Sequence, residues 1–238
     1  MKSLWEAAAT AFDLIWSFDT ALVEIVVLSL RVSFFALIFA AAIGLPLGAF
    51  LAVKSFPGRS FFVAILNALF GLPAVVVGLL VYLMLSRTGP LGIFGLLYTP
   101  AAMIIAQAVL ITPLVAALSR QTVLSFHQEY DEQLRSFGIT ALGSIPTLLW
   151  EARFSLSVVL LAGFGRAIAE VGTVMIVGGN IEHVTRVMTT AIALETSKGN
   201  LNLAVALGIV LLLISLLVNL ASQAVTALSN RWQGVSSS

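Results

Sequence analysis

Two residues of opposite charge, Arg166 and Glu170, stand inside an otherwise apolar stretch of the chain. Ionisable side chains at membrane depth are energetically costly, and they usually face the interior of a helix bundle or a water-filled cavity. A spacing of four residues would place both on one face of a helix, where they can form an ion pair. The pair therefore either lines or gates a path for a polar substrate, or neutralises itself and fixes helix packing.

The chain lacks the combinations of side chains that an intramembrane enzyme would need. Glu170 is the sole acid in the middle of a predicted span, and the two histidines, His127 and His183, lie in different predicted loops. There is no cysteine, no nucleophile motif of the Gly-x-Ser-x-Gly type, and no phosphate-binding loop, because the glycine spacing at 138–143 is followed by serine instead of lysine. We expect no catalytic residue, metal site or cofactor here, so ATP and its magnesium ion would be bound by another chain.

A polar segment at 120–153 is the only long interruption between membrane-like stretches. Its middle predicts a short helix that stops at Gly138, since glycine readily adopts the left-handed conformation that ends a helix. Leu134 and Phe137 are apolar residues in this charged surrounding, which suits docking into a groove on a soluble partner. An ordinary polar loop between two helices is the alternative. The charged residues of the segment include Glu129, Asp131, Glu132, Arg135, Glu151 and Arg153.

A second polar stretch follows the pair at 166 and 170. It begins with Gly178, Gly179 and Asn180 and continues with threonines at 185, 189, 190 and 196. Freed backbone N–H groups and threonine hydroxyls could pass an oxyanion without trapping it. A simple turn followed by an interfacial cap explains the same residues equally well.

The elements that must position these residues are membrane helices. The chain of 238 residues is 60% hydrophobic and 10% charged, and its mean hydropathy is +1.07, which excludes a soluble globular domain. A net charge of +1 gives no basic face for nucleic acid. Stretches of about 20 apolar residues suffice to cross a bilayer as helices. Five such spans are predicted, at 25–53, 61–85, 99–118, 154–177 and 201–228.

Two further features concern the first span and the residues before it. Gly44 and Gly48 form a GxxxG pair, which predicts a close approach of another helix. In residues 1–20 the polar side chains recur on one face of a helix and the apolar side chains on the other. This pattern predicts an amphipathic helix lying in the membrane interface. Residues 21–238 then form the transmembrane domain.

Basic residues in the short loops set the expected orientation, with the N-terminus outside and the C-terminus in the cytoplasm. Six basic residues would then be cytoplasmic and four external. The cytoplasmic ones are Lys54, Arg59, Arg120, Arg135, Arg153 and Arg231, and the external ones are Lys2, Arg87, Arg186 and Lys198.

The polar segment resembles the cytoplasmic signature of ABC-importer permeases, which reads Glu-Ala-Ala, three residues, Gly, nine residues, Ile-x-Leu-Pro. Glu132 and Gly138 match this signature, Leu148 replaces Ile, and Gln133 and Leu134 replace the alanines. The tract Gly163–Ile181, with its Arg-Ala-x-x-Glu-x-Gly pattern, is similar to the molybdate, sulfate and tungstate branch. The tract from Thr185 to Thr196 looks most like tungstate-type permeases.

The resemblance implies an all-α, polytopic permease of the type I importer fold in a prokaryotic plasma (inner) membrane. Its implied partners are a second copy of the chain, two copies of an ABC ATPase, an external binding protein and membrane lipid, with no nucleic acid. The expected cargo is tungstate, with molybdate or sulfate as alternatives. A self-sufficient secondary transporter is the competing hypothesis from another class, although five spans do not divide into two similar halves.

The resemblance also assigns roles to named residues. The expected coupling residues, which would contact the ATPase, are Glu132, Leu134, Arg135, Phe137, Gly138 and Thr140. The expected translocation pathway or gate consists of Arg166, Glu170, Thr173, Gly178, Gly179, Asn180, Thr189 and Thr190.

Overall fold

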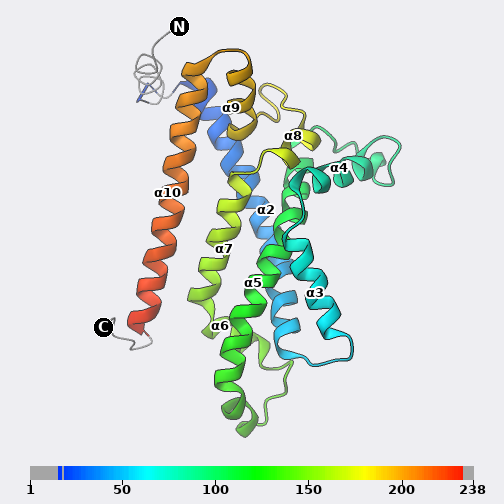
Figure 1. Cartoon of the computed structure of the whole chain (residues 1–238), viewed down its shortest axis with the longest axis vertical. Coiled ribbons are helices and arrows are strands. Elements are labelled where there is room, and N and C mark those ends of the chain that lie inside the picture. Colours follow the sequence, from blue (N-terminus) through cyan, green and yellow to red (C-terminus); the bar gives the residue numbers. More distant parts are fainter. Residues whose placement is uncertain (1–15, 18, 233–238) are drawn as a thin grey trace. The chain divides into compact units, whose positions relative to one another are not determined.

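The computed structural model describes residues 16–17 and 19–232, and the regular elements in this part of the chain are all helices (Figure 1). The predicted all-α class is confirmed. The predicted interfacial helix at 1–20 lies almost entirely outside the described residues. The elements in chain order are α2 (Thr20–Val53), α3 (Arg59–Phe70), α4 (Ala74–Leu85), the short 3-10 helix η1 (Gly92–Phe94), α5 (Pro100–Ser136), α6 (Ile145–Glu151), α7 (Arg153–Ile168), α8 (Gly172–Gly178), α9 (Met188–Ser197) and α10 (Leu201–Trp232).

The helices belong to two compact units, which are described separately below. Unit 1 comprises Met1–Ala36, Pro73–Gln107 and Arg166–Leu217, and unit 2 comprises Leu37–Leu72, Ala108–Gly165 and Val218–Ser238. The three long helices α2, α5 and α10 contribute residues to both units, whereas α4, α8 and α9 belong to unit 1, and α3 and α6 to unit 2.

Three helices in the described chain, α2, α5 and α10, are long and apolar enough to cross a membrane. Two bent pairs, α3 with α4 and α6 with α7, raise the number to five if each pair forms one span. The number agrees with the five predicted spans if each bent pair counts as one, although the fourth then covers 145–168 instead of the predicted 154–177. Some of the predicted spans are not continuous helices in the structure.

The second predicted span, at 61–85, is wrong as a single helix. The chain leaves the helical conformation between α3 and α4, where Gly71 and Pro73 lie. Proline lacks an N–H donor and disfavours helical geometry in the residue before it, so α3 cannot run on through this point. Pro73 instead takes an extended conformation and precedes the first turn of α4.

The third predicted span, at 99–118, is the first part of a longer helix. Helix α5 continues for 37 residues to Ser136, so the first half of the predicted polar segment is part of a long helix. The hydropathy of the sequence falls after residue 118, but glutamine, glutamate and arginine remain good helix formers. His127 consequently lies within α5 and not in a loop.

The predicted close approach at the GxxxG pair is confirmed within unit 2. A Cβ atom on Gly44 would lie 2.9 Å from Cγ1 of Val115, and one on Gly48 would collide with Oγ of Ser119. The Ser119 hydroxyl donates a hydrogen bond to the carbonyl of Gly44 at 3.2 Å. Small residues thus bring the backbones of α2 and α5 together, as they commonly do between membrane helices.

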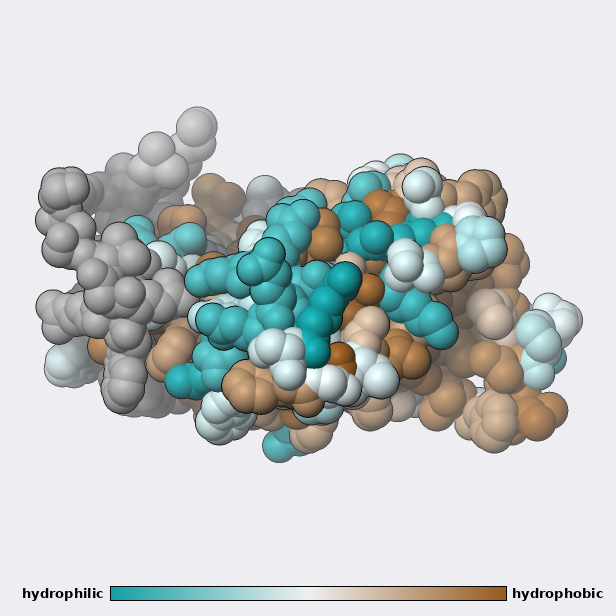
Figure 2. Space-filling view, turned by 90° about the horizontal axis from the view of Figure 1, so that it is seen from below, coloured by the Kyte–Doolittle hydropathy of each residue, from teal (hydrophilic) through white to brown (hydrophobic). Residues whose placement is uncertain are grey.

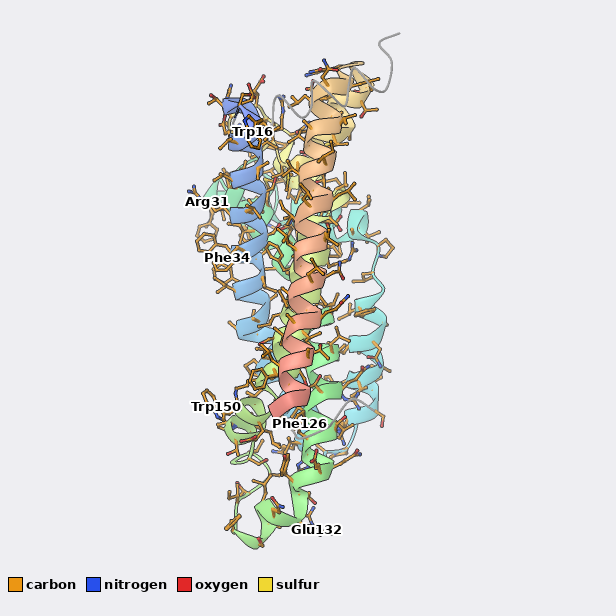
Figure 3. All side chains as sticks on the ribbon, turned by 90° about the vertical axis from the view of Figure 1, so that its left-hand side faces the viewer. Trp16, Arg31, Phe34, Phe126, Glu132 and Trp150 are labelled. Carbon is orange, nitrogen blue, oxygen red and sulfur yellow. The ribbon has the colours of Figure 1, made fainter. Side chains whose placement is uncertain are left out.

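Large apolar side chains remain exposed along the spanning helices. Phe34 and Phe35 of α2 in unit 1, Ile38 and Phe39 in unit 2, and Leu212 of α10 are all exposed, and Figure 3 shows Phe34 pointing away from the ribbon. In water such surfaces would be unfavourable, so they fit contact with lipid.

Candidate functional site

The first candidate site is the end of α5 and the chain that follows it in unit 2. Helix α5 ends in a Schellman motif: the N–H of Ile139 donates to the carbonyl of Leu134 at 3.0 Å, and the N–H of Gly138 to that of Arg135 at 2.9 Å. Gly138 has a φ of 70°, and a Cβ atom there would meet nothing within 4 Å. The glycine is therefore required by backbone conformation and not by space, as predicted.

The predicted coupling residues differ in what they offer to a partner. The Phe137 side chain is 79% exposed, and Glu132, which Figure 3 shows near the tip of α5, is also exposed. Arg135 is held by Asp131 through two contacts, Nη2 to Oδ2 at 2.9 Å and Nε to Oδ1 at 3.0 Å. Thr140 lies in the following turn, where its hydroxyl accepts a hydrogen bond from the N–H of Gly143.

Leu134, which was predicted as a docking residue, is less exposed than Phe137 in this structure. It is half-buried and packs against a core of unit 2 that includes Val123, Leu148 and Leu156. The reason is tertiary packing, because residues of α2, α6 and α7 meet at this core. Leu134 supports the turn, whereas the exposed apolar surface comes from Phe137.

Sequence reasoning missed other apolar residues exposed on the same segment. Ile139 and Leu142 follow the turn, and Trp150 on α6 is 67% exposed; Figure 3 shows Trp150 pointing outward. Helix α6 meets α7 at 77°, and the Arg153 guanidinium lies 5.0 Å from the Trp150 ring centre and 4.8 Å from that of Phe154. Their signal was available, because apolar residues are unexpected in an otherwise polar stretch.

A cavity of about 630 Å³ lies beside this turn. Its wall includes His127, whose buried Nδ1 atom has no hydrogen-bond partner in the described chain. Figure 2 shows hydrophilic side chains gathered on this end of the molecule. The other lining residues are Val53, Lys54, Ser55, Asp131, Leu134, Arg135, Ile139, Thr140, Ala141, Leu142 and Ser144.

The second candidate site, in unit 1, is a break in the fourth predicted span. Helix α7 ends at Ile168 and α8 begins at Gly172, so the continuous helix predicted over 154–177 is wrong. Arg166 lies in the last turn of α7 and Glu170 lies beyond it, and the two therefore do not share one helical face. They nevertheless form the expected ion pair, with Nη1 3.0 Å from Oε2. Glu170 is buried and Arg166 is 44% exposed.

Side chains satisfy the backbone groups that this break frees. Oε1 of Glu170 accepts the N–H of Thr173, a first-turn donor of α8, at 3.2 Å. Gln107 donates from Nε2 to the carbonyl of Ala167 at 3.0 Å, and the Thr189 hydroxyl donates to the carbonyl of Glu170 at 2.7 Å. Irregular backbone at membrane depth requires such partners. Gln107 escaped prediction, although it is the sole amide in the apolar run at 100–118.

Close contacts with other helices of unit 1 surround α8. A Cβ atom on Gly78 of α4 would lie 2.9 Å from Cα of Thr173, and one on Gly178 would lie 2.9 Å from Sδ of Met103. The Thr173 hydroxyl donates to the carbonyl of Ala74 at 2.8 Å. Glycine is needed at position 78 because a side chain there would press on the backbone of α8, whereas the contact at Gly178 is with the flexible end of Met103.

The eight predicted pathway residues thus fall into two groups. Arg166 and Gly179 are exposed and Asn180 is partly exposed, whereas Glu170, Thr173, Gly178, Thr189 and Thr190 are buried within the chain. The Thr190 hydroxyl donates to the carbonyl of Val187 at 3.0 Å. In this structure the hydroxyls of Thr173, Thr189 and Thr190 all donate to backbone carbonyls of the chain itself.

His183 lies in the turn between α8 and α9, where its Nδ1 atom is 2.8 Å from Oε2 of Glu24 on α2. The hydrogen bond and the negative charge of Glu24 raise the pKa of His183. Among the residues that the structure describes, no group of three or more His, Cys, Asp or Glu side chains could hold a metal ion.

Comparison with known proteins decides what kind of molecule carries these two sites. Residues 44–233 match the family described as the binding-protein-dependent transport system inner membrane component. The chain belongs to this family. It is therefore the permease subunit of an ABC importer, a non-catalytic, multi-pass membrane protein that works with an ATPase and a binding protein. This membership decides against the intramembrane enzyme and the self-sufficient transporter.

Individual relatives support the assignment over most of the permease chain. The tungstate uptake system permease protein TupB of Peptoclostridium acidaminophilum is 42% identical over 92% of this chain and 96% of its own length. A probable anion ABC transporter permease protein of Haloferax volcanii is 43% identical over 84% of this chain and 88% of its own length. A structure of the inward-facing MetNI methionine ABC transporter covers 91% of this chain and 98% of its own at a TM-score of 0.71, and its 19% identity shows the shared fold alone.

Proposed function

We propose that this permease imports tungstate. The observation that carries the proposal is 42% identity, over nearly the whole length of both chains, to a permease of a tungstate uptake system. The tract at 185–196, which looks like tungstate-type permeases, supports the same cargo. Molybdate and sulfate are the alternatives, because these oxyanions share the tetrahedral shape and charge of tungstate.

The working assembly contains two copies of this chain, two copies of an ABC ATPase and an external binding protein. The N-terminus is outside and the C-terminus is cytoplasmic, an orientation that the excess of basic residues in the loops of one side supports. Neither ATP nor magnesium binds to this chain, since it has no phosphate-binding loop.

The coupling site is the turn after α5. Glu132, Phe137 and Thr140 are exposed there and present a charge, an aromatic ring and a hydroxyl to a groove on the ATPase. Leu134, Arg135 and Gly138 hold the turn in shape, through the unit 2 core, the Asp131 ion pair and the left-handed backbone. Closure of the ATPases around ATP would move this turn and drive alternating access.

The pathway is lined by the exposed Arg166, Gly179 and Asn180. An arginine and the backbone N–H groups of a glycine turn are suitable donors for an oxyanion in transit. Glu170, Thr173, Gly178, Thr189 and Thr190 shape this region from behind, through the contacts that stabilise the break between α7 and α8.

Uptake from mixed oxyanions tests the cargo. The permease is produced with its ATPase and binding protein in cells that lack their own tungstate and molybdate importers, and cellular tungsten, molybdenum and sulfur are measured by mass spectrometry. Tungsten should accumulate preferentially, and an ATPase variant without its phosphate-loop lysine should abolish the accumulation. Preferential uptake of molybdate or sulfate would reassign the cargo, and an assembled complex that imports none of the three would contradict the proposal.

A further inference from the structure

An open pocket of about 460 Å³ lies between α3 and α5 in unit 2. One face of each helix forms its walls, because the lining residues recur at helical spacing, at 59, 60, 63, 64 and 67 on α3 and at 120, 124 and 128 on α5. The pocket shares no residue with the predicted coupling or pathway sets. The residues that line it are Arg59, Ser60, Val63, Ala64, Asn67, Arg120, Leu124 and Gln128.

Arg59 is fixed in position by the end of α2. Its Nε atom donates to the carbonyl of Leu51 at 2.8 Å, and its Nη2 atom donates to that of Ala52 at 2.9 Å. These bonds satisfy carbonyl groups at the end of the helix. They leave Nη1 without an acceptor among the described residues, so part of the charge and hydrogen-bonding capacity of Arg59 is still unused.

Arg120 has no partner at all in the described part of the chain. Its Nε atom is buried and makes no hydrogen bond, and none of the ion pairs includes it. No acidic residue is among those that line the pocket. A buried donor without an acceptor is destabilising, and more so when the group is charged. Two arginines beside one pocket without a counter-charge therefore indicate a missing anion.

The shape and chemistry of the pocket favour an oxygen-rich anion. A guanidinium group is planar and can donate two parallel hydrogen bonds to a tetrahedral oxyanion. Ser60, Asn67 and Gln128 add a hydroxyl and two amides to its lining. The pocket also lies beside the first turn of α3, a helix of 12 residues whose amino end carries partial positive charge.

We propose that the Arg59–Arg120 pocket binds a tetrahedral oxyanion group. Two sources offer this chemistry: the phosphate of an anionic phospholipid headgroup and a free inorganic oxyanion. The site is an addition to the transport cycle, and it does not depend on which cargo the importer carries.

The test compares Arg120→Met with Lys54→Met in the complete importer, purified with its ATPase into nanodiscs. Methionine keeps an apolar stem and removes the unpaired buried donor, so the variant should fold. Lys54 belongs to the same unit and is exposed, but it does not line this pocket. Phosphatidylglycerol retained by the complex is measured by native mass spectrometry. Binding of inorganic phosphate, which is not the proposed cargo, is measured by its effect on the unfolding temperature in nanodiscs of phosphatidylcholine alone.

Arg120→Met should weaken one of these two interactions about tenfold, as expected for the loss of a charge-assisted hydrogen bond, while Lys54→Met leaves it unchanged. Selective loss of phosphatidylglycerol identifies a lipid headgroup site, and selective loss of phosphate binding identifies a free oxyanion site. Equal retention of both ligands by the intact chain and by Arg120→Met would overturn the proposal. So would equal losses in both variants, which would indicate nonspecific attraction by positive charge.

Discussion

The polar residues at the break between α7 and α8 act mainly on the backbone. Gln107, Glu170, Thr173 and Thr189 each bond to a main-chain group that the break or a neighbouring helix end leaves available. Unsatisfied backbone groups cost several kcal/mol in a membrane, so these side chains determine whether the break can exist. The Arg166–Glu170 pair contributes a guanidinium group 3.0 Å from the buried Glu170 carboxyl group.

Removing first the charge of Arg166 and then that of Glu170 distinguishes a structural ion pair from a direct role in the translocation pathway. Arg166→Met should destabilise the protein by about 1–3 kcal/mol, because it leaves a buried carboxylate unpaired, with the effect reduced by the partial exposure of Arg166. Adding Glu170→Gln should restore most of the stability, since the amide oxygen can still accept the N–H of Thr173. Denaturation in detergent measures both changes.

The uptake rate of the double variant then reports on the pathway. Normal stability with lost uptake would assign Arg166 a direct contact with the cargo. A double variant that is no more stable than Arg166→Met would contradict the structural role of the pair. Exchanging the two charges would be a poorer test, because an arginine at position 170 could not accept the Thr173 N–H.

The contact between His183 and Glu24 predicts a pH dependence of stability. The folded-state pKa of His183 is raised, so the contribution of this contact is complete below the ordinary histidine pKa, about 6.5, and is lost as pH rises through the raised value. Glu182 and Arg186 lie nearby with opposing effects. Unfolding temperatures of the intact chain and of His183→Gln are measured from pH 5 to 9. The advantage of the intact chain should be largest at low pH and should shrink as the pH rises through the raised pKa of His183. Parallel curves for the two proteins would contradict it.

At the scale of elements, glycines set how closely α4 approaches α8. Alanine is favoured over glycine in a helix by about 1 kcal/mol. A Cβ atom on Gly208 of α10 would meet nothing within 4 Å, so Gly208→Ala should leave stability unchanged or raise it. Gly78→Ala should lower it, because the new methyl group would lie 2.9 Å from the Thr173 backbone. Unfolding temperatures check the difference in sign, and equal shifts would show that α4 and α8 can separate freely.

The sequence predicted where the helices lie better than where they break. Apolar length located the three long spanning helices α2, α5 and α10, because about 20 apolar residues suffice to cross a bilayer. The break before α4 had a visible signal in Gly71 and Pro73. The break after Ile168 had no proline, and its stability depends on Gln107 and Thr189, which are distant in sequence. Contacts of that kind cannot be read from local patterns.

The candidate sites show the same limit. Gly138 was predictable because a single residue type meets the conformational need of the turn, and its φ of 70° agrees. The burial of Leu134 was not predictable, since it depends on packing against α2, α6 and α7 within unit 2. The ion pair at 166 and 170 was correctly predicted, although the predicted continuous helix was not.

At the scale of the whole molecule, the permease is dependent on partners. It has an apolar exterior and no motif for binding ATP, so the energy for transport must arrive through a protein contact. The exposed apolar residues of the segment after α5, Phe137, Ile139, Leu142 and Trp150, occur among polar neighbours. That composition suits a contact with a soluble subunit.

The most direct test is co-purification of the ATPase with Gly138→Leu and with Gly199→Leu. Both glycines have positive φ, of 70° and 78°, and open space around Cβ, so each substitution imposes a similar strain of roughly 1–2 kcal/mol. Only Gly138 lies in the proposed coupling turn. The intact chain and Gly199→Leu should retain the ATPase in detergent, and Gly138→Leu should lose it and its ATP-driven uptake while still inserting into the membrane. Full retention and normal uptake by Gly138→Leu would contradict the coupling role.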